Sequence, residues 1–425
     1  MRSARFSPKG LGLLLAVVWS LAIADRPVIG QEAEVATETM VETLVARLDL
    51  EHYKATIKGL TRFGDRRQGT QRNRDAVDWI QQQLEAVGCP TERLDYVFAP
   101  APRASGRRGS LTAQLNPSEP TATGGRIGRN GTGPGGASLF GYRRRTGVER
   151  DPVAQPDERL RALNREEPVN GERQQVFCTK VGATRPDEMY ILGAHMDGHG
   201  MGEAANDDGS GTALVIELAR ILNAPDVVTE RTIRFALWNN EETGLNGSRA
   251  YVEQRAALQG RETPPGSGRF PEPRWLGMIQ HDMMLFDHGA PRADGTVSRD
   301  QRQEADVNIE YQSTAELADE ARVLAFFFKA ANDRFATDYP AAVGPHMTNT
   351  DSTPFMHIVP SISVRENERG MQIGAGWDPH WHQPTDVFST FVDDDFRLGL
   401  NAAQTTLAAV AQLAGAQLVA MPTRD

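Results

Sequence analysis

The pattern of apolar and polar positions along the chain predicts helices that alternate with strands. The segment NRDAVDWIQQQLEAVG, residues 73–88, places four apolar side chains at helical spacing and ends in glycine. The segment RLDYVF, residues 93–98, alternates apolar and polar positions and predicts a strand. Further strands are predicted at 174–181, 189–195, 232–240, 275–282 and 360–364, and further helices at 37–59, 210–223, 246–258, 315–335 and 394–414. This order is typical of a single α/β domain with a mainly parallel central sheet flanked by helices on both faces.

The first 24 residues have the pattern of a secretory signal peptide. Arg2, Arg5 and Lys9 precede a short apolar run that ends in Ala-Ile-Ala at Ala24. We therefore expect cleavage near Ala24, a secreted or periplasmic protein, and a flexible lead-in at 25–36. A membrane anchor is the alternative, although a span needs about 20 apolar residues. No later stretch is long and apolar enough to span a membrane.

The composition and the net charge of the chain exclude few classes of function. The chain is 39% hydrophobic and 24% charged, as in ordinary globular proteins. Its formal net charge of −10 argues against nucleic acid as a partner. The two cysteines, Cys89 and Cys178, can form a disulfide in an exported protein, or they can be two free buried thiols.

The segment 101–172 is predicted to be an insertion. Nine glycines and four prolines fall within 101–140, which disfavours long regular elements there. Arginines such as Arg107 and Arg108 make the segment locally basic. It is interpreted as a solvated insertion, and a flap that faces the substrate is the alternative.

Chemically active side chains gather where predicted strands end. The segment HMDGHGMGEAANDDGSG, residues 195–211, begins with His195 at the end of one strand and supplies Asp207. Glu241 follows a second strand, and Asp282 ends a third. Each residue alone has an ordinary explanation, such as a helix cap or a solvated loop carboxylate. Parallel strands present their carboxyl ends at one edge of the sheet. Because three predicted strands each end in such residues, the sequence predicts a shared site at that edge.

The residue types in this site point to a metal. Clustered carboxylates repel one another unless a positive charge lies among them. Histidines with several carboxylates suit zinc without any thiolate. A carboxylate has two oxygens, so it can bridge a pair of metals about 3.5–4 Å apart.

Five motifs together resemble the M28 family of zinc peptidases, aminopeptidases with a co-catalytic zinc pair. They are GAHMDG, ANDDGSG, ALWNNEETGLNGS, MIQHDM and HWHQPTD, in the family's order. The segment LTRFGDRRQGTQRNRDAVDWIQQQLEAVG is similar to the family's opening segment. The resemblance covers about residues 40–415 without the insertion. It implies a zinc-dependent exopeptidase (phosphorylase/hydrolase-like) fold in one catalytic domain at 37–420.

The resemblance also implies a role for each matching residue. His195 and Asp282 would be terminal ligands of one Zn²⁺, Glu242 and His382 would be terminal ligands of a second, and Asp207 would bridge the two ions. The peptide bond after the bridging aspartate is often cis in the family.

Two further residues have catalytic roles in this scheme. Glu241 would be the general base that takes a proton from metal-activated water. Asp197 would orient the imidazole of His195. His199 and Asp208 have no assigned role, and His199 is a candidate for touching the substrate.

The match departs from the family near its last motif. Many members carry a tyrosine there that stabilises the oxyanion, whereas Trp381 precedes His382 in this chain. His380 is a candidate donor in its place. Asp351, in the segment MTNTDSTPF, is a candidate for supporting the ligands.

These observations predict an exported zinc-dependent exopeptidase that acts on peptides, chiefly as an aminopeptidase. A carboxypeptidase of the same fold is an alternative, since Arg365 or an arginine of the insertion could bind a substrate carboxylate. A cyclase that resembles glutaminyl cyclases and holds one zinc is a second alternative. A metal-free binding module is a third, which the complete ligand set disfavours.

Overall fold

The structure is a computed structural model that describes residues 28–99, 148–286, 307–345, 349–366, 378 and 380–420. The predicted signal peptide and residues 101–147 of the predicted insertion lie outside the described residues. None of the helices in the described ranges combines the length and the apolar character that a membrane crossing requires.

The described strands form one large sheet and one small one. The large sheet has eight strands in the order β1-β2-β5-β3-β6-β9-β7-β8. Their bounds are β1 (Thr91–Phe98), β2 (Gly171–Lys180), β3 (Arg185–His195), β5 (Arg231–Trp238), β6 (Arg274–His281), β7 (Val307–Tyr311), β8 (Ala341–Pro345) and β9 (Ser361–Glu366). The small sheet pairs β4 (Val227–Thr229) with β10 (Ala416–Leu418).

The centre of the large sheet is parallel and its flanks are partly antiparallel. Strands β5, β3, β6 and β9 run parallel to one another. Strands β1 and β2 pair in antiparallel fashion, as do β2 with β5 and β7 with β9. The mainly parallel sheet is confirmed. The pattern did not predict β7 and β8, because strands of five residues owe their formation chiefly to pairing with neighbours.

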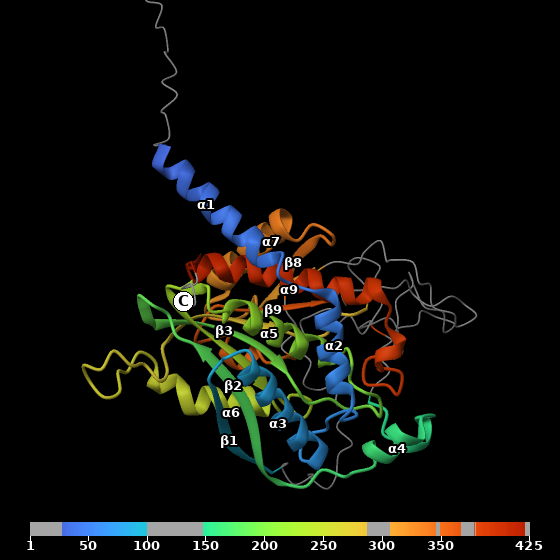
Figure 1. Ribbon diagram of the computed structural model, residues 1–425. Coiled ribbons are helices and arrows are strands. Elements are labelled where there is room, and N and C mark those ends of the chain that lie inside the picture. The colour runs from blue at the N-terminus through green and yellow to red at the C-terminus, as the bar shows by residue number, and fades with distance from the viewer. Residues whose placement is uncertain are drawn as a thin grey trace, which may run out of the picture.

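Helices cover both faces of the sheet unequally (Figure 1). Those in the described residues are α1 (Val28–Val45), α2 (Leu50–Thr61), α3 (Gln71–Ala86), α4 (Glu158–Asn164), α5 (Gly209–Leu222), α6 (Asn246–Arg255), α7 (Ala318–Phe335) and α9 (Asp393–Leu413), with the short 3₁₀ turns η2 (Pro152–Ala154), η3 (Ala256–Leu258), η4 (Thr353–Phe355) and η5 (Phe388–Thr390). Most of the helices share one large core with one face of the sheet. The other face packs α6 and η4 through an aromatic cluster that includes Trp238, Tyr251, Trp275 and Phe355.

Helix α5 lies at the centre of the larger core. All of its residues except Arg220 are buried. This burial explains why TALVIELARIL reads as a nearly continuous apolar run, since a helix that is apolar on all sides is a buried helix. The N-terminus of α5 is thereby fixed close to the carboxyl ends of the strands.

The first predicted helix and the flexible lead-in differ from the structure. The expected helix at 37–59 is two helices, α1 and α2, and α1 already begins inside the expected lead-in. Asp49 separates them, because its side chain accepts a hydrogen bond from the amide of His52 at 2.7 Å and caps α2. A cap of this kind starts a new helix within an uninterrupted apolar pattern.

The two cysteines form a disulfide. Cys89 follows α3, Cys178 lies in β2, and their Cα atoms are 5.7 Å apart. The bond therefore ties the helix-to-strand turn at Gly88 to the antiparallel flank of the sheet.

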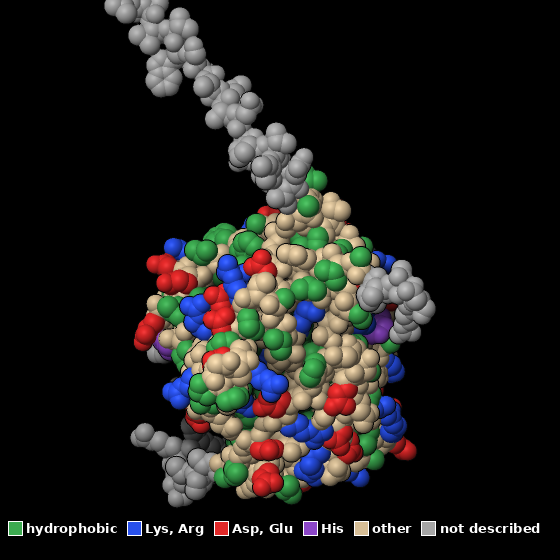
Figure 2. Space-filling model, turned by 60° about the vertical axis from the view of Figure 1, so that its left-hand side comes forward, with side chains coloured by type: hydrophobic (Ala, Val, Ile, Leu, Met, Phe, Trp, Pro, Cys, Tyr) green, Lys and Arg blue, Asp and Glu red, His purple; other side chains and the backbone are tan. Residues whose placement is uncertain are grey.

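Charged side chains of both signs share the surface. Figure 2 shows lysines and arginines interspersed with aspartates and glutamates across one face of the molecule. The coloured part of this view contains no broad area of one charge.

Candidate metal centre

The carboxyl ends of three neighbouring strands meet at one edge of the sheet. β3 ends at His195, β5 ends at Trp238, and β6 ends at His281. Because β3 runs parallel to both neighbours, the residues that follow these strands emerge on the same side. The loops there place Glu241 and Asp282 in the same region as His195.

Asp207 lies between two histidines and directs one carboxylate oxygen toward each. Its Oδ1 is 3.2 Å from Nε2 of His195, and its Oδ2 is 2.9 Å from Nε2 of His382. Asp282 stands on the first side, with Oδ1 3.6 Å from Nε2 of His195. Glu242 stands on the second side, with Oε2 2.9 Å from Nε2 of His382. The structure thus brings together all five expected ligands, in two groups that share Asp207.

The donor atoms of this cluster suit a divalent cation. Three combinations bring their ligand atoms within 4.8 Å of one another: His195 with Asp207 and Glu242, His195 with Asp208 and Asp282, and His199 with Glu242 and His382. Oε1 of Glu242 is buried and has no hydrogen-bond partner among the described residues. A buried carboxylate oxygen without a donor is costly, and a metal ion would satisfy it.

The pKa values of the buried carboxylates show that negative charges lie close together in this cluster. Burial raises the pKa of Glu241 well above its ordinary value, and the charge of Glu242 adds to the shift. Burial also raises the pKa of Glu242, to which the charge of Asp207 contributes. Burial would raise the pKa of Asp207 as well, but His382 and His195 outweigh it and hold that pKa well below its usual range. A cation among these carboxylates would stabilise their charged forms in the same way.

Asp197 orients His195 with its main-chain carbonyl rather than with its carboxylate. Nδ1 of His195 is 2.8 Å from the carbonyl oxygen of Asp197 and 3.9 Å from its Oδ1. Because Nδ1 donates to a carbonyl, Nε2 presents its lone pair to the cluster. Oδ1 of Asp197 instead accepts a hydrogen bond from the amide of Glu241 at 2.9 Å. Asp197 therefore positions both a ligand and the loop of the expected base.

Asp208 has a structural role beneath the ligands. The Asp207–Asp208 peptide bond is cis, as in many members of the family that the motifs resemble. Oδ1 of Asp208 accepts hydrogen bonds from the amides of Gly211 at 2.8 Å and Met283 at 3.2 Å, and Oδ2 accepts one from His195 at 3.1 Å. Since both oxygens are already engaged, Asp208 joins β3, β6 and α5 instead of offering a free ligand atom.

Asp386 holds the chain that carries Asp207. Its Oδ1 accepts a hydrogen bond from the amide of Asn206 at 2.8 Å, and its Oδ2 accepts one from the amide of Asp207 at 3.1 Å. Its side chain is buried. Sequence reasoning did not identify this residue, although its place in the motif HWHQPTD was an available signal.

His199 joins the second group of ligands. Its Nε2 lies 3.0 Å from Oε2 of Glu242 and 3.1 Å from Nε2 of His382. The rings of the two histidines meet edge to face, with centroids 4.0 Å apart. Burial and the charge of His382 lower the pKa of His199 well below its ordinary value, which favours the neutral imidazole that metals bind. His199 is therefore one more possible ligand, beyond the five predicted.

Close packing fixes His382 against the loop of the first motif. The ring of Trp381 stacks on that of His382, with centroids 3.5 Å apart and an angle of 26°. Gly200 has φ +103°, and a Cβ there would lie 2.3 Å from the carbonyl carbon of His382. Only glycine combines this backbone conformation with so close an approach.

Arg66, in the family-like opening segment, clamps the same loop. It is fully buried, and besides a 3.4 Å hydrogen bond to the nearby carbonyl of Gly64, its guanidinium donates hydrogen bonds to three main-chain carbonyls of that loop. The acceptors are Met196 at 2.9 Å, Glu203 at 2.8 Å and Ala204 at 2.8 Å. Sequence reasoning identified the segment but not this function, because the partners of the arginine are main-chain atoms about 130 residues away.

The remaining candidates take supporting positions. Nδ1 of His380 lies 2.9 Å from Oγ1 of Thr385. Asp351 is buried and accepts a hydrogen bond from the hydroxyl of Ser248. Burial raises the pKa of Asp351 to about 7.

Arg365 is buried beside Asp282. Its side chain is 2% exposed. Burial would raise the pKa of Asp282, but the charge of Arg365 is the largest of the effects that hold it below its ordinary value. The charge of Arg365 therefore supports Asp282, and the alternative in which Arg365 binds a substrate carboxylate stays a prediction.

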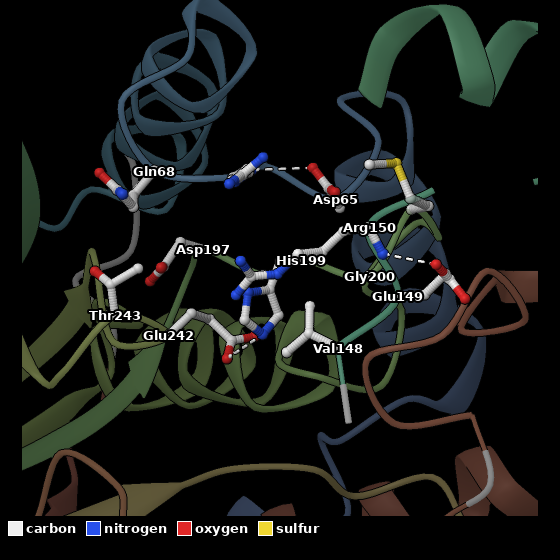
Figure 3. A pocket seen from close by; sticks show the side chains of 13 residues that line it. Asp65, Gln68, Val148, Glu149, Arg150, Asp197, His199, Gly200, Glu242 and Thr243 are labelled. Atoms are coloured by element: carbon white, nitrogen blue, oxygen red, sulfur yellow. Dashed lines mark hydrogen bonds and ion pairs between the residues drawn. The ribbon is translucent and has the colours of Figure 1, made fainter. Parts of the chain in front are cut away.

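A pocket of about 70 Å³ opens beside this cluster. Glu242 and His199 lie at its centre in Figure 3, with Gln68 and Thr243 on one side and Glu149 on the other. The pocket is the natural approach to the second group of ligands.

Comparison with known proteins identifies the family. The family model described as Peptidase family M28 matches residues 176–398, just over half of the chain. This chain belongs to peptidase family M28. The matched range contains all five motifs at full length, so the resemblance seen in the sequence is confirmed.

Individual relatives match shorter stretches. A segment of 82 residues, 19% of this chain, is 43% identical to the probable lipoprotein aminopeptidase LpqL of Mycobacterium tuberculosis (strain ATCC 25618 / H37Rv) and spans 16% of that protein. The matched segments thus cover only a small part of the length of the curated relatives.

Solved structures show that the fold is shared. The aminopeptidase from Aneurinibacillus sp. strain AM-1 superposes with a TM-score of 0.54 at 19% identity, over 91% of this chain and 98% of that one. BSAP, a zinc aminopeptidase from Bacillus subtilis, superposes with a TM-score of 0.55 at 16% identity, over 86% of this chain and 95% of that one.

Proposed function

We propose that this protein is a two-zinc aminopeptidase that removes N-terminal residues from peptides. The observation that carries the proposal is the position of Asp207, whose two oxygens face two different histidines at 3.2 and 2.9 Å. A carboxylate in that position is suited to bridge two metal ions. The names of the curated relatives and of the solved structures support the same activity.

The remaining ligands divide between the two ions. His195 and Asp282 would hold one Zn²⁺, and Glu242 and His382 would hold the other. When bound, the ions would lower the pKa of a water molecule toward about 7 and polarise the substrate carbonyl. The nitrogen and oxygen donors match the ligands that zinc accepts.

Glu241 would move the proton in the reaction. It takes a proton from the attacking water as the water oxygen bonds to the carbonyl carbon, and it delivers that proton to the amine nitrogen as the C–N bond breaks. Its main chain is held at the site by the hydrogen bond to Asp197, which keeps the base next to the ligands. Burial excludes bulk water from this exchange.

The acidic character of the site favours the amino end of a peptide. The carboxylates of Asp197, Glu241 and Asp351 are buried, and burial raises the pKa of each. The charge of Asp351 adds to the rise in the pKa of Glu241, and the charge of Asp197 adds to that of Asp351. A protonated α-amine would gain from pairing with them.

Export from the cytoplasm is part of the proposal. The disulfide between Cys89 and Cys178 supports it, because such bonds persist in oxidising compartments. Localisation of the full chain with its first 24 residues, and of a chain without them, tests this point. Retention of both in the cytoplasm would contradict export.

Substitution of the base tests the mechanism. Glu241→Gln should lower kcat by about 10²–10⁴-fold while two metals stay bound, because the amide cannot take a proton. Glu253→Gln, an exposed glutamate of α6, is the matched control and should behave as the unaltered protein. Near-normal turnover of Glu241→Gln would exclude its role as base.

Metal content tests the number of ions. Elemental analysis of the purified protein after dialysis against trace zinc should give two zinc ions per chain. A single ion would favour the cyclase alternative, and glutaminyl peptides would then be the substrates to assay.

A further inference from the structure

Residues 148–150, the start of the segment 148–156, line the pocket beside the metal ligands. The amide of Glu149 donates a hydrogen bond to the carbonyl oxygen of His382 at 3.0 Å. Nε2 of Gln155, a buried side chain, donates to the carbonyls of Met201 at 2.7 Å and Pro384 at 3.0 Å. This part of the predicted insertion is therefore attached to the two loops that carry the ligands.

Helix α4 fastens the same segment from its other end. Nδ2 of Asn164 donates a hydrogen bond to the carbonyl of Gly202 at 2.8 Å, and its Oδ1 accepts one from the amide of Asp65 at 3.1 Å. Asn164 is 1% exposed. Residues 148–164 thus form a fixed part of the site rather than a solvated loop, which favours the alternative interpretation of a segment that faces the substrate.

Two arginines bring positive charge to this pocket. Arg150, from the insertion, and Arg67, from the opening segment, both line it together with His199 and Glu242. Among the described residues, no carboxylate pairs with the guanidinium of Arg150. The one ion pair of Arg67 in the described ranges is with Glu167 at 3.7 Å, and the side chain of Glu167 is 85% exposed.

The acidic groups on the same wall are already engaged. Asp65 is buried and pairs with Arg72 at 2.7 Å. Oε1 of Glu149 accepts hydrogen bonds from the amides of Arg150 and Asp151, both at 2.8 Å. The two guanidinium groups therefore keep most of their capacity to bind an anion, next to a cluster that is otherwise acidic.

We propose that Arg150 and Arg67 recognise a carboxylate of the substrate. The two guanidinium groups line the same pocket as His199 and Glu242, so a carboxylate that they bind would lie beside the metal ligands. Guanidinium groups bind carboxylates through paired, charge-assisted hydrogen bonds. The inference rests on the proposed peptidase function and adds a substrate class to it.

The carboxylate has two chemical sources in a peptide. It is the C-terminal group of a dipeptide, or the side chain of an acidic residue next to the cleaved bond. Three substrate pairs separate them: Leu-Ala against Leu-Ala amide, Leu-Glu amide against Leu-Gln amide, and Glu-Ala amide against Gln-Ala amide. In each pair only one member carries the carboxylate, so the ratio of their KM values reports on its recognition.

The test combines substitutions in the protein with changes in the substrate and asks whether their effects on KM depend on each other. In Arg150→Gln, we expect the KM of the substrate with the carboxylate to rise on the order of tenfold relative to the KM of its uncharged partner, in one of the three pairs. The loss of a charge-assisted hydrogen bond predicts a change of this size. Arg150→Lys should restore part of the shift, and adding Arg67→Gln should enlarge it. Arg165→Gln, an exposed arginine of the same segment that does not line the pocket, is the matched control.

The outcomes separate this inference from the proposed function. The substrate pair whose KM ratio changes in Arg150→Gln identifies the source of the carboxylate. If the unaltered enzyme cleaves these peptides but no pair shifts in Arg150→Gln or in the double variant, the anion subsite is wrong while the peptidase function stands. If the metal-loaded enzyme cleaves none of them, the peptidase function itself fails.

Discussion

Asp386→Asn is the substitution that most directly probes how the fold holds the bridging ligand. The two oxygens of Asp386 each accept one amide hydrogen, from Asn206 at 2.8 Å and from Asp207 at 3.1 Å. Asparagine has the same shape but only one oxygen, so in either orientation one amide faces an NH₂ group. The loss of a charge-assisted hydrogen bond costs about 1.5–3 kcal/mol. Because the affected chain carries Asp207, we expect metal affinity to fall about 10–100-fold.

Competition with a chelator measures that affinity, and kcat/KM at saturating metal measures what remains of catalysis. Urea unfolding of the same variant shows how much of the loss is global. Asp333→Asn is the control, because it removes an exposed carboxylate whose partner Lys329 is 2.7 Å away on the surface of α7. Metal affinity and kcat/KM within twofold of the unaltered protein would refute the view that Asp386 positions Asp207.

Three further predictions concern stability. Replacing Cys89 and Cys178 by serine should lower the free energy of unfolding by about 2–5 kcal/mol, since the bond closes a loop of 89 residues; denaturation of the oxidised and the reduced protein checks this. Glu272→Ala should cost about 3–5 kcal/mol in urea unfolding, because it removes the carboxylate that pairs with the buried guanidinium of Arg234; a cost below about 1 kcal/mol would contradict this. Removing the metal with a chelator should abolish activity and lower the melting temperature, and an unchanged melting temperature would show that the buried carboxylates do not need a cation.

Most of the site could be anticipated from local sequence. His195 and Asp282 stand directly at the ends of apolar runs, and a parallel sheet brings such ends to one edge. Glu241 and Glu242 follow a third run in the same way. The residue types then indicated a metal, and the joint motifs indicated the family, because their order along the chain carries more information than any one of them.

The residues that support the site could not be anticipated in the same way. Asp386, Arg66 and Asn164 act on main-chain atoms that lie far away in the sequence. Nothing in their local pattern distinguishes them from ordinary polar residues. The role of the carbonyl of Asp197 is hidden for the same reason, since every residue has a carbonyl and only the fold selects one as a partner for His195.

By itself, the sequence determined the alternation of strands and helices, the edge of the sheet where polar groups gather, and the family. These follow from periodicity and residue type, which are local properties. Only the tertiary structure decided that Asp207 faces two histidines, that Arg365 is buried beside Asp282, and that Arg150 enters the pocket. Those outcomes depend on how distant segments pack, and packing is set by the shape and hydrogen bonding of the whole core rather than by any single stretch of the chain.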